Sequence, residues 1–334
     1  MKATQILRTL SLIAAASALV AGCSSASGST ATPDTQALTN VTVETIPAVD
    51  LAGMYIAQTD GFFTQAGLHV TIKSISSSSA VIASQLAGKV DISAGAYVGY
   101  ISAEAAGAKF RILAEADMLQ PNVRAVVSAN NSPITNLAQL EGKKVGVNGT
   151  NSVGTLLISM LLAEQGISPK SVDFVTDPKG FPDMPGQLQH GAWDAAFLAE
   201  PYITSAEEQY GDQSVADLDQ GGAVNFPIDG YVATQSWTEQ HPKVAAAFVQ
   251  ALEKGQAIAS NSSPAVRAAV QKYDSQPAQV TAAMALPGFP VGTPDEAAIQ
   301  GVAQAMVQYG ILGGKYSTEI DNGSLVQAMF RPAY

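Results

Sequence analysis

The chain has 334 residues, with 17 Lys and Arg against 28 Asp and Glu, so its formal net charge is −11. An acidic chain of this kind lacks the basic surface that nucleic acid or an anionic membrane would bind. Its one cysteine, Cys23, excludes an internal disulfide, and we expect neither a structural zinc site nor thiol catalysis. A length of about 300 residues is near the size at which one hydrophobic core gives way to two.

The first 22 residues predict a secretion signal. Lys2 and Arg8 give a positive start, and the apolar stretch LSLIAAASALV is too short to span a bilayer. The stretch ends in VAGC, which resembles the cleavage box of bacterial lipoproteins, and an ordinary signal peptide cut elsewhere is the alternative. We therefore expect a lipoprotein signal peptide over 1–22, a lipid anchor on Cys23 and a flexible Ser/Thr/Ala/Gly-rich tether over 23–40.

From Val41 onward, short β-rich runs alternate with amphipathic helical stretches. VTVETI predicts a strand, AGMYIAQTDGFFTQAG a helix interrupted at Gly61, and LHVTIKSI a second strand. SSSSAVIASQLAG predicts a helix that starts with capping serines and ends at Gly88, and KVDISAG a strand before the helix AYVGYISAEAAG. FRILAEADM and RAVVSA are further strands. This alternation predicts βαβ units and a largely parallel sheet.

The same order then repeats. KKVGVN predicts a strand, SVGTLLISMLLAEQG a helix, SVDFVT a strand, and GAWDAAFLAEPY a strand that leads into the helix YITSAEEQY. QLAGKVDISAG and QLQHGAWDAAF each place a glycine three residues before an aspartate, at Gly88 and Asp91 and again at Gly191 and Asp194. A repeated supersecondary unit of this kind indicates a duplicated lobe.

After about Tyr231 the sequence turns helical. HPKVAAAFVQALEKGQAIASN and TPDEAAIQGVAQAMVQYGIL predict long amphipathic helices whose Ala-rich faces need a partner. We expect the chain to return to the first lobe, with crossings near Arg124–Ser128 and Asp229–Thr234. The expected division is lobe I over 41–123 plus 229–334 and lobe II over 124–228.

The sequence contains little that indicates a catalytic site. The three histidines have no metal-ligand spacing, GTNSVG lacks the Gly-x-Ser-x-Gly pattern, and GKKVGVNG is not a phosphate loop. Asp50 with Glu200 is the carboxylate pair that an exported hydrolase would use as general acid and base. We expect no catalytic residue, metal or cofactor.

Small polar and aromatic residues follow the predicted strands, where open α/β sheets bind ligands. Pro201 holds Glu200 extended at such an end. Each residue also has a structural explanation, as a helix cap, a core aromatic or a turn residue, and Gly154 could admit either a ligand or a neighbouring strand. The candidate ligand-binding residues are Asp50, Ser76, Ser77, Ser78, Ser79, Tyr97, Tyr100, Thr150, Asn151, Ser152, Glu200, Tyr202 and Asp229.

Several segments in order resemble the solute-binding proteins of ABC importers, in the branch that serves nitrate, sulfonates and thiamine-precursor pyrimidines. They are AGMYIAQTDGFFTQAGLHVTI, QLAGKVDISAG, ITNLAQLEGKKVGVN, GAWDAAFLAEPY and TQSWTEQHPKVAAAFVQAL, and the resemblance runs from Val41 to about residue 310. It implies an α/β, type II-like periplasmic-binding-protein fold. Each of its two lobes would be a mainly parallel sheet flanked by helices, joined by a two-strand hinge.

The resemblance also implies a function and partners. We expect a monomer, lipid-anchored on the extracytoplasmic side of the cell membrane, that delivers a small solute to an ABC permease with its ATPase subunits. Relatives that are enzymes of pyrimidine synthesis carry a signature with Cys and His. This chain has no cysteine beyond Cys23, which favours binding over catalysis.

The candidate residues favour one solute class. Asp50, Glu200 and Asp229 are acidic, and no Lys or Arg stands among the candidates, so a nitrogen-bearing heterocycle of the thiamine-precursor pyrimidine type is expected. Tyr97, Tyr100 or Tyr202 would stack on its ring. The alternatives are a sulfonate or nitrate held by neutral donors at helix N-termini, the hydrolase, and a lipid-anchored interaction protein without a small ligand.

Overall fold

The computed structural model describes residues 37–330. The expected signal peptide, the lipid anchor on Cys23 and most of the tether lie outside these residues. Strand β1 (Thr39–Thr45) begins inside the expected tether range, so regular structure starts two residues earlier than the sequence suggested. No helix within 37–330 combines the length and the apolar character that a membrane span needs.

The first sheet has five strands in the order β2-β1-β3-β10-β4. Strands β1, β2 and β3 are parallel, whereas β10 runs antiparallel to both of its neighbours. The sheet is therefore mixed rather than largely parallel. Strand β10, which returns from the second half, lies between β3 and β4 and runs in the opposite direction. The remaining strands are β2 (Leu68–Ser74), β3 (Ile92–Ala96), β4 (Phe110–Glu115) and β10 (Asp229–Thr234).

The second sheet repeats this plan in the order β7-β6-β8-β5-β9. Its three parallel strands, β6, β7 and β8, are followed by β5, which is antiparallel to β8 and β9. In both sheets the fourth strand is the one that enters from the other half. Strand β9 was not predicted from the sequence, because its short run QSVAD carries a weak apolar pattern. The strands are β5 (Arg124–Ser128), β6 (Lys144–Val147), β7 (Asp173–Thr176), β8 (Ala195–Ala199) and β9 (Gln213–Asp217).

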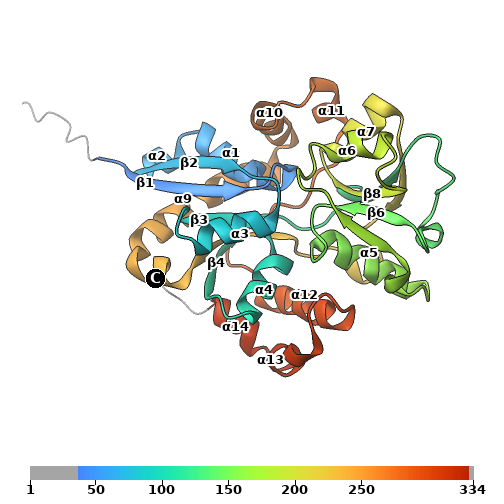
Figure 1. Cartoon of the computed structure of the whole chain (residues 1–334). Coiled ribbons are helices and arrows are strands. Elements are labelled where there is room, and N and C mark those ends of the chain that lie inside the picture. The colour runs from blue at the N-terminus through green and yellow to red at the C-terminus, as the bar shows by residue number, and fades with distance from the viewer. Residues whose placement is uncertain (1–36, 331–334) are drawn as a thin grey trace, which may run out of the picture. The chain divides into compact units, whose positions relative to one another are not determined.

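Helices cover both faces of each sheet (Figure 1). In the first half, α1, α2 and α9 lie on one face and α3 and α4 on the other; in the second half, α5 lies opposite α6 and α7. The predicted break at Gly61 is confirmed, since this residue has a φ of +73° between α1 and α2. The bounds are α1 (Ala52–Thr59), α2 (Phe62–Gln65), α3 (Ser78–Leu86), α4 (Tyr97–Ala105), α5 (Val153–Glu164), α6 (Met184–Gln189), α7 (Tyr202–Tyr210) and α9 (Pro242–Asn261).

Two glycines show how closely these layers pack. A Cβ at Gly255 of α9 would overlap the carbonyl oxygen of Gly53 in α1, so the two helices meet backbone to backbone. A Cβ at Gly154 of α5 would overlap the ring of Phe197 in β8. Gly154 is therefore explained by packing against a neighbouring strand, which was one of its two sequence interpretations.

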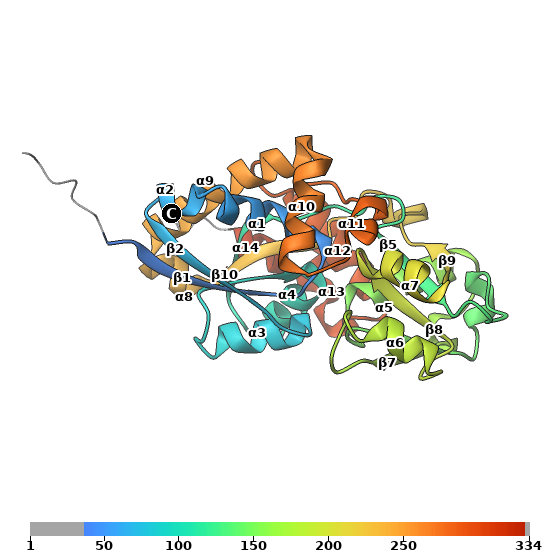
Figure 2. The same ribbon diagram turned by 90° about the horizontal axis from the view of Figure 1, so that it is seen from above.

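The C-terminal helices contact both halves, as Figure 2 also shows. The expected return to the first half is confirmed by α12 and α14, which pack against α4, and by α9, which packs against α1. In addition, α11 contacts α7 and α12 contacts α5, so this segment bridges the two sheets. The remaining helices are α8 (Gln235–Gln240), α10 (Ser263–Tyr273), α11 (Ala278–Ala283), α12 (Glu296–Gln308), α13 (Ser317–Asp321) and α14 (Ser324–Phe330).

The internal repeat seen in the sequence has a structural counterpart. The Asp91 carboxylate accepts the N–H of Thr42 in β1 at 2.8 Å, and the Asp194 carboxylate accepts the N–H of Lys144 in β6 at 2.9 Å. Gly88 and Gly191 precede them with φ values of +68° and +70°. Each half thus uses one glycine to end a helix and one aspartate to fix the start of the next strand against the first strand.

The chain crosses between the halves twice, and we call these segments the two crossings. They are residues 116–123, between β4 and β5, and residues 218–228, between β9 and β10. They run side by side, since Leu119 N–H donates to the Phe226 carbonyl at 2.8 Å and Ile228 N–H donates to the Asp117 carbonyl at 3.3 Å. The crossings that we expected near Arg124–Ser128 and Asp229–Thr234 lie instead just before these residues, which form strands β5 and β10. We propose the pair of crossings as the two-strand hinge. The lobe boundaries 41–123 plus 229–334 and 124–228 remain the division that we propose.

Candidate functional site

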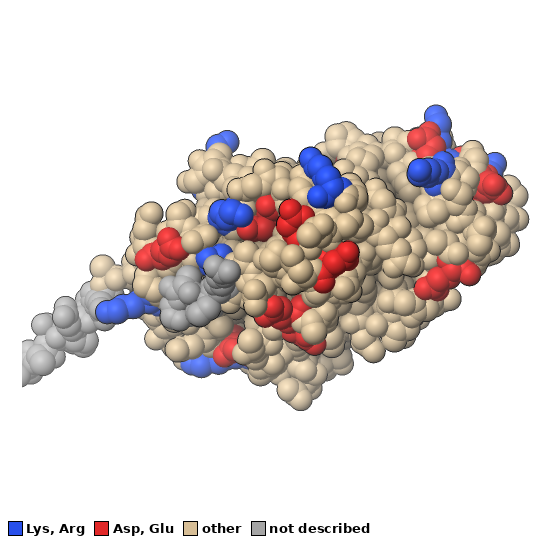
Figure 3. All heavy atoms as spheres, turned by 90° about the horizontal axis from the view of Figure 1, so that it is seen from below, with Lys and Arg blue, Asp and Glu red and all other residues tan. Residues whose placement is uncertain are grey.

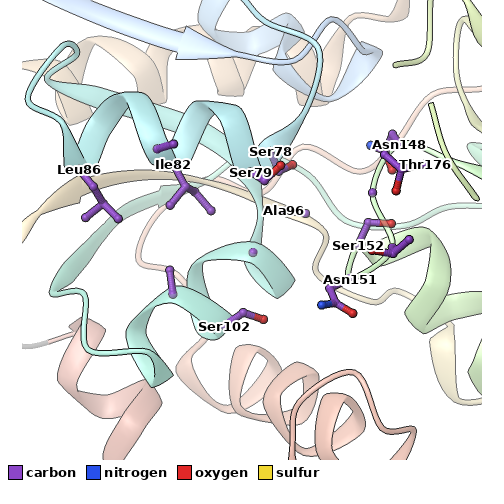
Figure 4. A pocket seen from close by; sticks show the side chains of 15 residues that line it. Ser78, Ser79, Ile82, Leu86, Ala96, Ser102, Asn148, Asn151, Ser152 and Thr176 are labelled. Atoms are coloured by element: carbon purple, nitrogen blue, oxygen red, sulfur yellow. The ribbon is translucent and has the colours of Figure 1, made fainter. Parts of the chain in front are cut away.

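A pocket of about 520 Å³ lies between helices α3 and α4 of the first half and the loop that follows β6 in the second half (Figure 4). Its polar groups are hydroxyls and amides, and its apolar groups come from α3, α4 and the end of β3. No charged residue of the described chain lines it. The lining residues are Ser78, Ser79, Ile82, Ala83, Leu86, Ala96, Gly99, Ser102, Ala103, Asn148, Gly149, Thr150, Asn151, Ser152 and Thr176.

Two helices from opposite halves begin at this pocket. Ser77 caps α3 by accepting the N–H of Ala80 at 3.3 Å, and the next two serines line the pocket. At α5, Ser152 and Thr155 form a capping box, in which the Thr155 hydroxyl accepts the N–H of Ser152 at 3.0 Å. Because helix N-termini carry a partial positive charge and free N–H groups, this pair favours a solute with an electron-rich end.

Two buried polar atoms of the pocket residues have no hydrogen-bond partner within the described chain. They are Oδ1 of Asn148 and Oγ of Ser152. Asn148 directly follows β6 and is 6% exposed. Buried polar groups are normally hydrogen-bonded, so these atoms indicate where a solute would bond. Asn148 is not among the residues predicted from the sequence, although its position at the end of a predicted strand was a usable signal.

The loops that follow β2 in the first half and β7 in the second half meet beside the pocket. Asp177 accepts the N–H groups of Lys179 and Gly180 at 2.6 and 3.0 Å, which turns the loop after β7. Gly180 has a φ of +72°, and a Cβ there would overlap the carbonyl oxygen of Ser76. The two halves are therefore in contact at this point, and only glycine permits the approach.

None of the three expected ligand carboxylates lines the pocket. Asp50 and Asp229 belong to a buried cluster at the crossings, which we call the hinge cluster. Its members are Asp50, Asp117, Arg124 and Asp229, each at most 2% exposed. Arg124 Nη2 lies 2.7 Å from Asp50 Oδ1, 3.7 Å from Asp117 Oδ2 and 3.8 Å from Asp229 Oδ2. The expectation that no basic residue accompanies these aspartates was therefore wrong, because Arg124, at the start of β5, was assigned to a strand and not to a site.

Burial dominates the electrostatics of the hinge cluster. It raises the pKa of the Asp229 carboxyl to about 7, with the Asp50 charge adding to the shift and Arg124 opposing it. It also raises the pKa of Asp117 well above its usual range, where Asp50 and Asp229 add to the shift. Three carboxylates around one guanidinium cannot all lose their protons cheaply in a buried space.

Glu200 is buried, as expected, but it bonds to the protein. Its two oxygens accept the hydroxyl and the N–H of Thr204 at 2.8 and 3.1 Å, and Oε1 also accepts the N–H of Ala285 at 3.0 Å. Its burial raises its pKa, which these hydrogen bonds partly offset. Glu200 therefore caps the first turn of α7 and ties the second half to the segment after α11, which fits the capping interpretation of the sequence.

The aromatic candidates are mostly core residues. Tyr97 and Tyr100 are fully buried, and the Tyr100 hydroxyl lies 2.8 Å from Ser93 Oγ. Tyr202 donates a hydrogen bond to Asp274 at 2.8 Å and lines a separate groove of about 430 Å³ between α6, α7 and the α10–α11 loop. None of the three lines the pocket between α3 and α5.

The structure thus divides the candidate residues into groups. Ser78, Ser79, Thr150, Asn151 and Ser152 line one pocket, and Ser76 and Ser77 adjoin it. Asp50 and Asp229 belong to the hinge cluster, whereas Glu200 and Tyr202 join α7 to the C-terminal segment. The hydrolase pair, Asp50 with Glu200, is committed to different partners and forms no shared acid–base site.

The face of the molecule drawn in Figure 3 has no large patch of only acidic or only basic side chains. Basic and acidic side chains lie there in small groups that are separated by wide uncharged areas. The net negative charge of the chain is therefore not gathered into one patch on this face.

Comparison with solved structures identifies the fold. The E. coli periplasmic aliphatic sulphonate-binding protein SsuA aligns with a TM-score of 0.65 at 19% identity, over 83% of this chain and 94% of that one. The periplasmic nitrate-binding protein NrtA of Synechocystis PCC 6803 aligns with a TM-score of 0.71 at 16% identity, over 87% and 88% of the two chains. At these identities the likeness shows a shared fold, that of periplasmic binding proteins.

Sequence comparison assigns the family. A curated relative, 4-amino-5-hydroxymethyl-2-methylpyrimidine phosphate synthase of Uromyces fabae, is 25% identical over 214 residues, which are 60% of this chain and 61% of that enzyme. The model of a family described as NMT1/THI5 like matches residues 48–265, well over half of the chain. The two mixed sheets, the paired crossings and this match agree with one another, and the chain belongs to the NMT1/THI5-like family.

Proposed function

We propose that this protein is the solute-binding component of an ABC importer and that its solute enters the pocket between α3, α4 and α5. The observation that carries this proposal is the pocket itself, which is built from both halves at the ends of their strands. Its two unpartnered buried atoms, on Asn148 and Ser152, supply unused hydrogen-bonding capacity. The proposal includes a monomer, an extracytoplasmic location, a lipid anchor on Cys23 and delivery to a permease, with no chemical change to the solute.

The lining favours an organic anion of the sulfonate type. Its donors are hydroxyls, amides and the N-termini of α3 and α5, and the nearby carboxylates lie in the hinge cluster instead of the pocket. An anionic head would sit between the two helix N-termini, where the macrodipoles favour negative charge. Ile82, Ala83 and Leu86 on α3 give an apolar wall for the organic body.

A pyrimidine of the thiamine-precursor type is the second candidate. The name of the Uromyces fabae relative and the family match favour it. Charge complementarity does not favour it, because Asp50, Glu200 and Asp229 do not line the pocket. An aminopyrimidine would instead donate to the Asn148 amide oxygen and accept from the serine hydroxyls.

Calorimetric titration separates the candidates. We would titrate an alkanesulfonate and an aminopyrimidine into the wild type and into Asn148→Ala, with Asn130→Ala as the matched control on an exposed loop. Sulfonate binding that weakens about tenfold in Asn148→Ala only, through loss of the N–H donors of the Asn148 amide, would support the first candidate. Aminopyrimidine binding with the same pattern would support the second.

The remaining outcomes test solute binding itself. A metabolite screen by thermal shift follows if neither compound binds, since a solute at 100 times its Kd stabilises a binder by about 2.7 kcal/mol. No stabilisation by any metabolite would contradict the proposal and favour an interaction protein. Turnover with a bell-shaped pH profile would contradict it in favour of a hydrolase.

A further inference from the structure

The hinge cluster joins both crossings to strands of the two halves. Asp50 follows β1 of the first half, Asp117 lies on the first crossing, Arg124 begins β5 of the second half, and Asp229 begins β10 at the end of the second crossing. The crossings are also linked directly, since the N–H of Asp229 donates to Asp117 Oδ1 at 3.0 Å. A change of charge in this cluster therefore acts on both crossings at once.

The cluster holds more negative than positive charge. Three carboxylates surround one guanidinium, which leaves two negative charges without a counter-charge if all three are ionised. One oxygen of each carboxylate, namely Asp50 Oδ2, Asp117 Oδ2 and Asp229 Oδ1, is buried without a hydrogen-bond partner in the described chain. Burying uncompensated charge is costly, so the cluster must take up positive charge to be stable.

A metal ion does not fit as that positive charge. The three aspartates can each offer an oxygen within 4.8 Å of the others, which is a spacing that a cation could use. Arg124 Nη2 already lies within 3.8 Å of all three carboxylates, however, so the centre of the group is occupied by a cationic nitrogen. Protons on the unpartnered oxygens are the remaining way to balance the charge.

We infer that the hinge cluster is a proton-linked switch. The arrangement in the structure, with the two halves in contact at Ser76 and Gly180, is the closed form in this inference, and it holds protons that a more open arrangement releases. Opening moves Asp50 and Arg124 with different halves and exposes the carboxylates to water, where they ionise readily. Acidification therefore favours closure, and alkaline pH favours opening.

The surroundings of the cluster agree with proton retention. Burial raises the pKa of Asp229 to about 7 and that of Asp117 well above its usual range. The groups that face the cluster from neighbouring elements are neutral tyrosines and one further acid. Burial raises the pKa of the tyrosines, most strongly for Tyr97, Tyr231 and Tyr273, and it also raises the pKa of the acid. The tyrosines that interact with the aspartates are Tyr97 and Tyr100 on α4, Tyr231 on β10 and Tyr273 on α10. Tyr55 on α1 and Glu115 on β4 interact with Tyr231 and Tyr97 in turn.

The sign of the effect follows from linkage. A carboxyl whose pKa is higher in the closed form binds its proton more tightly there, so closure is favoured while that proton stays bound. The advantage is complete below about pH 4, the ordinary value for aspartate, and is lost as the pH rises to about 7. Within that window the ratio of closed to open protein falls by up to tenfold per pH unit for each proton.

Small-angle X-ray scattering of the full chain without solute tests this inference. The radius of gyration of the wild type should increase between pH 5 and pH 8, with most of the rise below about pH 7. Asp229→Asn keeps an uncharged side chain at all pH values and should flatten this curve, and Asp117→Asn serves the same purpose if the first variant does not fold. Asp60→Asn, at an exposed position after α1, should behave as the wild type.

Two results would overturn the inference. One is a wild-type radius that stays constant from pH 5 to pH 8. The other is a pH response in a folded Asp229→Asn or Asp117→Asn protein that matches the wild type. If neither variant folds, the wild-type and Asp60→Asn curves decide, since the inference requires the same rise in both. Because the experiment uses no solute, its result is independent of which solute the pocket takes.

Discussion

The pocket and the hinge cluster lie close together in the fold but are built from opposite chemistry. The pocket has no charged lining residue in the described chain, and its polar atoms belong to small residues at the starts of α3 and α5. The hinge cluster packs three carboxylates around Arg124 with almost no exposure to solvent. Both features follow strand ends, so position alone does not distinguish a residue that meets solute from one that sets the geometry of the crossings.

The largest expected effect comes from removing the one cation of the hinge cluster. Arg124→Leu leaves three buried carboxylates without a counter-charge, and we expect the free energy of unfolding to fall by about 3–5 kcal/mol at pH 7.5. The loss should be smaller at pH 5, because protonation removes the repulsion. Urea unfolding at both pH values measures this, with Lys170→Met as an exposed control. An equal loss at the two pH values would contradict the charge-based account of the cluster.

Glu200 sharpens the comparison because it belongs to neither region. In Glu200→Gln one acceptor oxygen becomes an amide NH2 group that faces donors from Thr204 or Ala285. We therefore expect the free energy of unfolding to fall by about 1–3 kcal/mol. Solute affinity should change less than threefold. Calorimetry and urea unfolding measure the two quantities, and Glu207→Gln on the same helix is the control. A tenfold loss of affinity without a loss of stability would return Glu200 to the solute site.

A smaller effect is expected within the pocket. Asn148→Ala removes a buried amide whose oxygen has no protein partner, so solute affinity should fall about tenfold, or about 1.4 kcal/mol. Stability should hardly change, because no hydrogen bond within the described chain is lost. The comparison fails if this variant unfolds readily but binds solute as the wild type does, since Asn148 would then be structural.

Ser152→Ala should have the smallest effect. Its hydroxyl is one uncharged donor among several in the pocket, and we expect a loss of affinity of about threefold, which is near the lower range for a single hydrogen bond. Titration beside Ser168→Ala, which lies outside the pocket, provides the reference. A loss well above tenfold would indicate that the head of the solute rests mainly on the start of α5.

Much of the fold could be predicted from the sequence because local patterns and tertiary structure agree. The strand–helix alternation, the break at Gly61 and the repeated Gly-x-x-Asp all follow from turn and strand chemistry within a few residues. Strand β9 and the short C-terminal helices α10, α11, α13 and α14 could not be found in this way. Their packing partners lie far away in sequence, and their own patterns are weak.

The candidate site was predicted only in part for a related reason. The serines and Asn151 could be found because they open helices after strands, a feature that is local in the sequence. The roles of Asp50 and Asp229 depend on Arg124, which stands 74 residues from Asp50 in the chain, and no local pattern links them. Asn148 was missed because a single amide at a strand end is an ordinary feature until its oxygen is seen to lack a partner.

The most direct test of the central claim is a crystal structure of the protein with its solute bound. The account predicts electron density in the pocket between α3, α4 and α5, within hydrogen-bond distance of Asn148 and Ser152, while Asp50 remains paired with Arg124. Solute density against Glu200 or Asp229, or in the groove between Tyr202 and Asp274, would contradict it.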